Sequence, residues 1–137
     1  MGCDIHAHLE IKLDGKWEHY SIPKINANYE LFEFLAGVRA GYNQEDIEPL
    51  SMPRGLPEDI TRVTAYEARW MGDDGHSFSW IDSHEIRKMF DFMKKLGVEG
   101  HSQVGLLVGN RWNYFHEYRE DYPGEIEDIR MVFWFDN

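Results

Sequence analysis

The sequence predicts an α+β fold, in which a small, mostly antiparallel sheet contains the N- and C-terminal strands and two to three helices pack on one face. Residues 3–12 alternate between apolar and polar side chains, residues 86–96 carry apolar side chains at helical spacing, and residues 127–137 form a dense apolar run. The first pattern is typical of a half-buried strand and the second of an amphipathic helix. A length of 137 residues suits a single domain over residues 1–137.

The first strand has two chemically different faces. One face carries Cys3, Ile5, Ala7, Leu9 and Ile11, and the other carries Asp4, His6, His8, Glu10 and Lys12. Asp14-Gly15 follows, before the run KWEHY at residues 16–20. Because an Asp-Gly pair readily adopts the positive φ angles of a two-residue turn, we expect a β-hairpin here.

Capping signals place two helices. Asn28 can cap a helix over residues 29–40, where apolar side chains recur at helical spacing. Asp82 and Glu85 form an acidic capping pair before a second amphipathic run, which we expect to stop at Gly97.

The remaining segments complete the expected order. Residues 41–59 are rich in Pro, Gly and acidic residues, which indicates a long loop of the kind that is often functional in small domains. Residues 60–70 predict either a short strand or a helix, and residues 105–119 predict a helix. The run at 127–137 is apolar on both sides, which is typical of a central strand or one covered on both faces. If it pairs antiparallel with the first strand, Asp136 lies near Asp4.

Composition limits the classes of partner. The formal net charge is −11, from 14 basic and 25 acidic residues, so the chain repels the phosphate backbone and bulk nucleic-acid binding is disfavoured. Solubility alone also explains this charge. No apolar run approaches the roughly 20 residues of a membrane span, the N-terminus shows no secretion signal, and the single Cys3 cannot form an internal disulfide. These features predict a cytoplasmic protein.

Asp4, His6 and His8 are the first candidate site. Alternate residues of a strand point the same way and lie roughly 6.5–7 Å apart, so two imidazoles and a carboxylate can share one divalent ion such as Zn or Mn. The alternative is that this row is the solvent face of an ordinary strand, because Glu10 and Lys12 continue it.

The second candidate is DDGHSFSW, residues 73–80. A carboxylate such as Asp74 beside His76 can orient the imidazole or bind a metal with it. Ser77 invites a nucleophile interpretation, although the G-x-S-x-G elbow is missing. The alternative is a turn whose Asp and Ser side chains cap the next helix.

Two arginines and a tryptophan are candidate ligand-binding residues. Arg39, at the end of the first helix, and Arg54, in PRGLPED, can each clamp a phosphate or carboxylate. Trp80 can supply a stacking face for a nucleobase. Ordinary surface exposure also accounts for both arginines.

The motifs GCDIH (2–6), NYELFEFLAGVR (28–39), PRGLPED (53–59), DGHSFSW (74–80) and RMVFWFDN (130–137) cover nearly the whole chain. Together they resemble a family of short, mostly uncharacterised proteins of bacteriophages and prophages. The resemblance implies a phage protein that works in the host bacterial cytosol. Small phage proteins of this kind often counter host defence, including defence that signals with cyclic nucleotides or cyclic ADP-ribose derivatives.

Three hypotheses for function follow. In the first, Asp4, His6, Asp74 and His76 form one pocket and, with a divalent metal, hydrolyse the phosphate ester of a defence signalling nucleotide. His76 or Asp74 is then the general base or a ligand, and Arg39 or Arg54 holds the phosphate. The second is a non-catalytic sponge that sequesters such a nucleotide, with a homo-oligomer expected. The third is an acidic decoy for a host DNA-binding protein.

Overall fold

A computed structural model describes residues 2–98 and 126–137. Four strands form one antiparallel sheet in the order β2-β1-β4-β3. The elements are β1 (Asp4–Leu13), β2 (Lys16–Ser21), α1 (Tyr29–Ala36), α2 (Arg62–Met71), the 3-10 turn η1 (Gly72–Asp74), β3 (Gly75–Asp82), α3 (Ser83–Leu96) and β4 (Ile126–Asp136). The predicted α+β class is confirmed. The helix expected over residues 105–119 lies outside the described residues.

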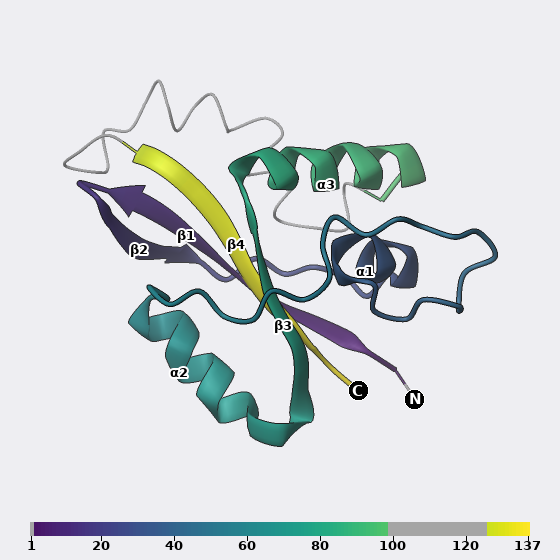
Figure 1. The fold of residues 1–137 in the computed structure, drawn as a ribbon, viewed down its shortest axis with the longest axis horizontal. Helices are drawn as coiled ribbons and strands as arrows, with labels where there is room; N and C mark the ends of the chain where they lie inside the picture. The colour runs from purple at the N-terminus through teal and green to yellow at the C-terminus, as the bar shows by residue number, and fades with distance from the viewer. Residues whose placement is uncertain (1, 99–125) are drawn as a thin grey trace.

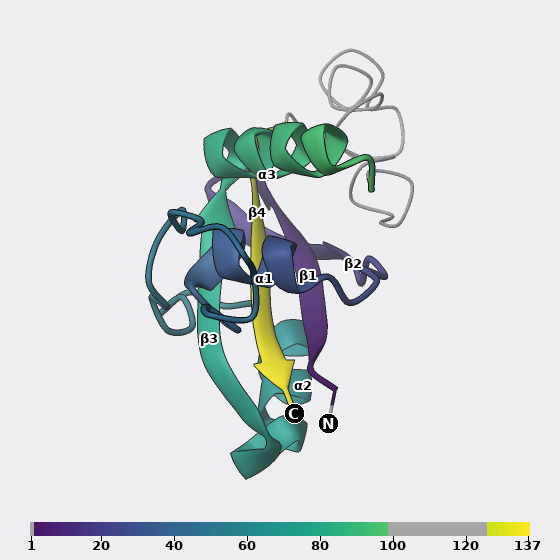
Figure 2. The same cartoon turned by 90° about the vertical axis from the view of Figure 1, so that its right-hand side faces the viewer.

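The hairpin and the central strand agree with the sequence. β1 and β2 are joined by Asp14 (φ 49°) and Gly15 (φ 78°), the positive-φ pair that a two-residue hairpin turn requires. β4 lies between β1 and β3, and it pairs Asp136 with Asp4 across the ladder. Figures 1 and 2 accordingly show the two chain ends side by side.

One face of the sheet carries the hydrophobic core. Alternate residues of β1 and β4 point to this face, and α1 and α3 cover it. Its fully buried members include Leu9, Ile11, Met131, Phe133, Phe135, Leu31, Phe32, Leu35, Ile86, Met89 and Met93. The two covering helices have the predicted caps. Leu31 N–H donates to Asn28 Oδ1 over 2.9 Å, and Asp82 and Glu85 form a reciprocal capping box.

α2 lies on the opposite face of the sheet, so the expectation that all helices pack on one face was wrong (Figure 1). The segment 60–70, which predicted a strand or a helix, is helical through most of its length. Thr64 and Ala68 are its buried residues, and both are small. None of the described helices is long and apolar enough to span a membrane.

DGHSFSW lies in strand β3 except for Asp74, which ends η1, so the alternative interpretation of this segment as a turn was wrong. Its pairing with β4 runs from His76 opposite Phe135 to Ser79 opposite Phe133, so β3 contains one extra residue there. This β-bulge places Ser77 at a φ of 57°, and it breaks the period-two alternation by which a strand is recognised in sequence. The long loop crosses β3, where Gly55 N–H donates to the Phe78 carbonyl over 2.8 Å.

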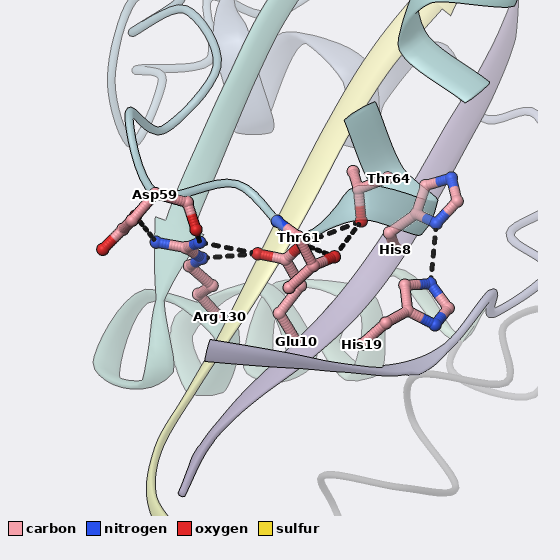
Figure 3. Close-up of polar contacts among 7 residues, drawn as sticks. All are labelled: His8, Glu10, His19, Asp59, Thr61, Thr64 and Arg130. Carbon is pink, nitrogen blue, oxygen red and sulfur yellow. Dashed lines mark hydrogen bonds and ion pairs between the residues drawn. The ribbon is translucent and has the colours of Figure 1, made fainter. Parts of the chain in front are cut away.

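A buried polar cluster fixes α2 to the sheet (Figure 3). Glu10 of β1 and Arg130 of β4 face each other in the ladder, and they are 0% and 5% exposed. Arg130 Nε and Nη2 each lie 2.7 Å from Glu10 Oε1. The other carboxylate oxygen accepts from Thr61 N–H over 3.0 Å and from the Thr64 hydroxyl over 2.8 Å. One carboxylate therefore holds both a partner strand and the first turn of α2.

Arg130 extends this cluster to the loop and to β2. Its Nη1 lies 2.6 Å from Asp59 Oδ1, and this contact lowers the pKa of the Asp59 carboxyl. The guanidinium carbon lies 4.1 Å from the centre of the Trp17 ring, a cation–π distance. The charge of Arg130 is thus compensated by two carboxylates and one aromatic face.

We predict that Glu10→Ala lowers the free energy of unfolding by about 3–5 kcal/mol, because it leaves Arg130 charged and buried without its main partner. Urea denaturation measures this change. Glu18→Ala, at an exposed position of the neighbouring strand, is the matched control and shifts stability by no more than about 0.5 kcal/mol. The double variant Glu10→Ala/Arg130→Ala loses less than the sum of the two single changes. Equal effects of Glu10→Ala and Glu18→Ala would contradict the role of the pair.

Candidate functional site

The histidine row of β1 is enclosed by α2 instead of facing solvent. His8 is 0% exposed, and its ring stacks on Trp134 at 5.4 Å between centroids. His8 Nδ1 lies 2.9 Å from His19 Nε2, so one of the two nitrogens carries the shared hydrogen (Figure 3). His8 Nε2 lies 3.2 Å from Glu67 of α2, at ion-pair distance but outside hydrogen-bond geometry. The solvent-face interpretation therefore does not hold for His8.

Burial sets the protonation of this pair. Desolvation is the largest effect on both His8 and His19, and it lowers the pKa of each imidazole. The carboxylates of Glu67 and Glu10 act in the opposite direction, but they are smaller effects. Two protonated rings cannot share the hydrogen between Nδ1 and Nε2. The arrangement thus favours neutral imidazoles.

His6 lies at the rim of the same face, with 29% of its side chain exposed. Its Nε2 is 2.6 Å from Asp136 Oδ2, and its Nδ1 is 4.0 Å from Glu67 Oε1. Asp4, at the start of β1, is exposed and sits directly opposite Asp136. Like charges across a ladder repel, so the contact with His6 offsets the cost of placing these two carboxylates together.

The side chains of the predicted metal set Asp4, His6 and His8 do not point to one common position. His6 is turned toward Asp136, and His8 toward His19. Within residues 2–98 and 126–137, no group of three or more His, Cys, Asp or Glu side chains is arranged to hold a metal ion. The metal stays a prediction, and we derive no chemical step through it.

A second polar cluster forms at the end of the sheet, on the face that α1 covers. We call it the terminal cluster, and its members are Arg39, His76, Ser77 and Asn137. Asn137 Oδ1 lies 3.2 Å from His76 Nε2 and 3.5 Å from Arg39 Nη2. His76 Nδ1 is 3.0 Å from Ser77 Oγ, and the His76 ring stacks on Phe135. Three residues singled out in the sequence are brought together here.

Aromatic rings hold Arg39 in place. Its guanidinium carbon lies 5.0 Å from the ring centre of Tyr29 and 5.3 Å from that of Tyr42. A hydrogen bond to the Cys3 side chain is the largest cause of the raised pKa of Arg39, while burial raises the pKa of Cys3 itself. The cation is therefore fixed at the rim of the sheet rather than free to move in solvent.

The structure does not combine the two histidine motifs into one pocket. His6 pairs with Trp134 and His76 with Phe135, and adjacent residues of a strand point to opposite faces. Asp74 is exposed in η1, just before β3. The predicted four-residue site of Asp4, His6, Asp74 and His76 is thus divided by the sheet.

Arg54 and Trp80 have a structural role. Arg54 makes a bidentate ion pair with Glu85, with both N–O distances at 2.7 Å, and it donates to the Trp80 carbonyl. Its guanidinium lies over the Trp80 ring at 4.9 Å, so it covers the face that we expected to stack on a base. These contacts fasten the long loop to β3 and to the start of α3.

Sequence reasoning missed four contributors. Asn137 belongs to the terminal cluster, Tyr29 and Tyr42 pack against its Arg39, and Glu67 contacts two histidines. The expected pairing of Asp136 with Asp4 was the one signal that pointed to the C-terminal residues. Glu67 becomes recognisable only once residues 60–70 are assigned to a helix that covers the histidine face.

Comparison with known proteins identified no relative of this chain. The chain matches no family model, and neither a curated protein nor a solved structure is significantly similar to it. The resemblance to phage and prophage proteins remains a prediction.

We predict that the protein loses stability as the pH falls below about 6.5, the ordinary pKa of histidine. The folded state lowers the pKa of His8 and His19, so below 6.5 the unfolded chain binds more protons and the unfolding free energy rises with pH. Thermal melts between pH 5 and pH 8 measure this slope. A His8→Leu/His19→Leu variant has a flatter profile, whereas His84→Gln, at an exposed site on α3, keeps the wild-type slope. An unchanged slope in the double variant would refute the assignment.

Proposed function

We propose that the protein binds a phosphorylated small molecule of the nucleotide class at the terminal cluster and cleaves its phosphate ester with His76. The observation that carries the proposal is the meeting of these side chains at one end of the sheet, where Asn137 contacts Arg39 and His76, and His76 contacts Ser77. Guanidinium, imidazole and hydroxyl groups are the donors that proteins commonly use for phosphate oxygens.

Charge separation supports this location. The chain carries a net charge of −11, and Asp4, Asp136 and Glu67 surround His6 on the other face. A phosphate is repelled from that carboxylate group. Arg39 and His76 lie across the sheet from it, so they offer the phosphate a local cation on an acidic protein.

His76 is suited to acid–base work because both ring nitrogens have polar neighbours. In the proposed hydrolysis, water attacks phosphorus, a new P–O bond forms, and the ester P–O bond breaks. One nitrogen of His76 takes a proton from the attacking water, and the imidazolium so formed gives that proton to the leaving alkoxide, which returns His76 to its neutral form. Arg39 offsets negative charge on the phosphate oxygens, and Asn137 is a positioning residue that holds both side chains.

The sponge is the second candidate. It is favoured by the division of the predicted catalytic set between two faces, since binding needs Arg39 and its neighbours but no shared metal pocket. The decoy, the phage origin, the host cytosolic location and a homo-oligomer stay predictions.

We predict that Arg39→Gln weakens binding of a cyclic dinucleotide or a cyclic ADP-ribose derivative about tenfold, because a charge-assisted hydrogen bond is removed. His76→Gln lowers turnover by about 100-fold or more and leaves affinity nearly unchanged, since general acid–base groups contribute on that scale. Calorimetry gives the affinity, and mass spectrometry of the nucleotide over time, in EDTA, gives the turnover.

Arg62→Gln makes the same charge change on exposed α2 and is the control for Arg39. Melting temperatures of all variants show whether each one folds. Binding without turnover in the wild type, with intact nucleotide recovered on heating, replaces the hydrolase by the sponge. Wild-type affinity in Arg39→Gln would overturn the site for both candidates.

A further inference from the structure

The outward face of α2 exposes large side chains that the fold does not use. Tyr66 and Trp70 are 63% and 74% exposed, and Val63 is 48% exposed. The same helix uses Thr64 and Ala68 against the sheet. Figure 1 shows α2 on the side of the sheet away from α1 and α3. Exposed aromatic side chains at adjacent positions commonly mark a binding surface.

Tyr66, Arg69 and Trp70 line a shallow groove of about 310 Å³. Tyr66 and Trp70 are four residues apart, so their rings are neighbours on the helix surface. Arg54 and Arg130 are each held by carboxylates, whereas Arg69 takes part in none of the ion pairs within the part of the chain that the structure describes. The groove thus combines two aromatic rings with an uncompensated cation.

We infer that this groove is a binding site for a small planar aromatic anion of the nucleoside monophosphate class. The ring system stacks on Tyr66 and Trp70, and Arg69 pairs with the phosphate. This site is separate from the terminal cluster, and it does not depend on the function proposed there.

The size of the patch favours a small molecule over a protein. An aromatic side chain buries about 150–250 Å² when covered, so two contribute at most about 500 Å². A stable protein–protein interface needs about 800 Å² from each partner. The groove volume lies at the lower end of the roughly 300–1,000 Å³ that is usual for ligand sites, which suits a mononucleotide.

Charge distinguishes a mononucleotide from a nucleic-acid strand. Asp73 and Asp74 are exposed one turn beyond Trp70, and the chain as a whole carries −11. A strand would bring further phosphates against these carboxylates, whereas a single phosphate can pair with Arg69 alone. An uncharged aromatic molecule would leave the guanidinium without a role.

The test follows the indole N–H signals of the ¹⁵N-labelled protein during titration with AMP. Trp70 is assigned from the signal that disappears in Trp70→Phe. We expect AMP to shift this signal, adenosine to shift it with about tenfold weaker affinity, and ribose 5-phosphate not to shift it. Tyr66→Ala weakens AMP binding roughly 5- to 100-fold, on the scale of one lost stacking contact. Arg69→Gln removes the preference for AMP over adenosine.

Two controls are matched to these changes. Tyr42→Ala removes a tyrosine of similar exposure at 67%, and Arg62→Gln removes an exposed arginine of the same helix; both keep the AMP-induced shift of Trp70. Arg39→Gln also keeps it, so failure of the terminal cluster leaves this result intact. The inference is overturned if millimolar AMP does not move the Trp70 signal, or if Arg69→Gln binds as the wild type does. It is also overturned if the protein is a dimer that Tyr66→Ala/Trp70→Ala dissociates, because a second copy then covers the groove.

Discussion

The buried ion pair between Glu10 and Arg130 determines how the second face of the sheet is covered. α1 buries four apolar residues in the core, including Leu31, Phe32 and Leu35, whereas the buried residues of α2 are only Thr64 and Ala68. So little apolar area cannot by itself fix a helix on a sheet. The position of α2 depends instead on the Glu10 carboxylate, which holds Arg130 with one oxygen and Thr61 and Thr64 with the other. A buried ion pair is stable only when all of its hydrogen bonds are formed, because losing a partner leaves a charge that neither water nor protein stabilises.

Covering this face has a consequence for the histidines. With α2 in place, His8 is fully buried between Trp134, His19 and Glu67, and burial favours its neutral form. His6, at the open rim, makes a short hydrogen bond with Asp136 instead. The row that resembles a metal site in sequence is therefore part of the packing that joins β1, β2 and α2. The terminal cluster lies on the other face, at the end of the sheet.

The sequence predicted contacts between residues that are close together in the chain, but it did not predict contacts between distant residues. The Asn28 cap, the Asp82–Glu85 box and the Asp14-Gly15 turn involve neighbours within three residues, and each was predicted correctly. The contacts of Glu10 with Thr61 and Arg130 span 51 and 120 residues, so no local pattern announces them.

β3 was not predicted as a strand, and the reason here is different. The extra residue at the bulge after His76 shifts the alternation, and a strand with a shifted period resembles a polar turn. For the terminal cluster, the residue types of Arg39, His76 and Ser77 marked them as candidates, but the sequence did not predict that they lie together. Asn137 connects Arg39 with His76, and no sequence pattern identified this asparagine as part of a site.

The last two residues of the chain connect both faces of the sheet. Because successive side chains of a strand alternate, Asp136 reaches His6 on the face of α2, and Asn137 reaches His76 and Arg39 on the face of α1. The sheet consequently separates the carboxylates near His6 from the side chains of Arg39 and His76, although Asp136 and Asn137, which contact the two groups, are adjacent in sequence. Arg39 and His76 therefore lie across the sheet from the carboxylates of Asp136 and Glu67 that face His6. The antiparallel pairing of β4 with β1 on one side and with β3 on the other is thus what brings His6 and His76 to Asp136 and Asn137.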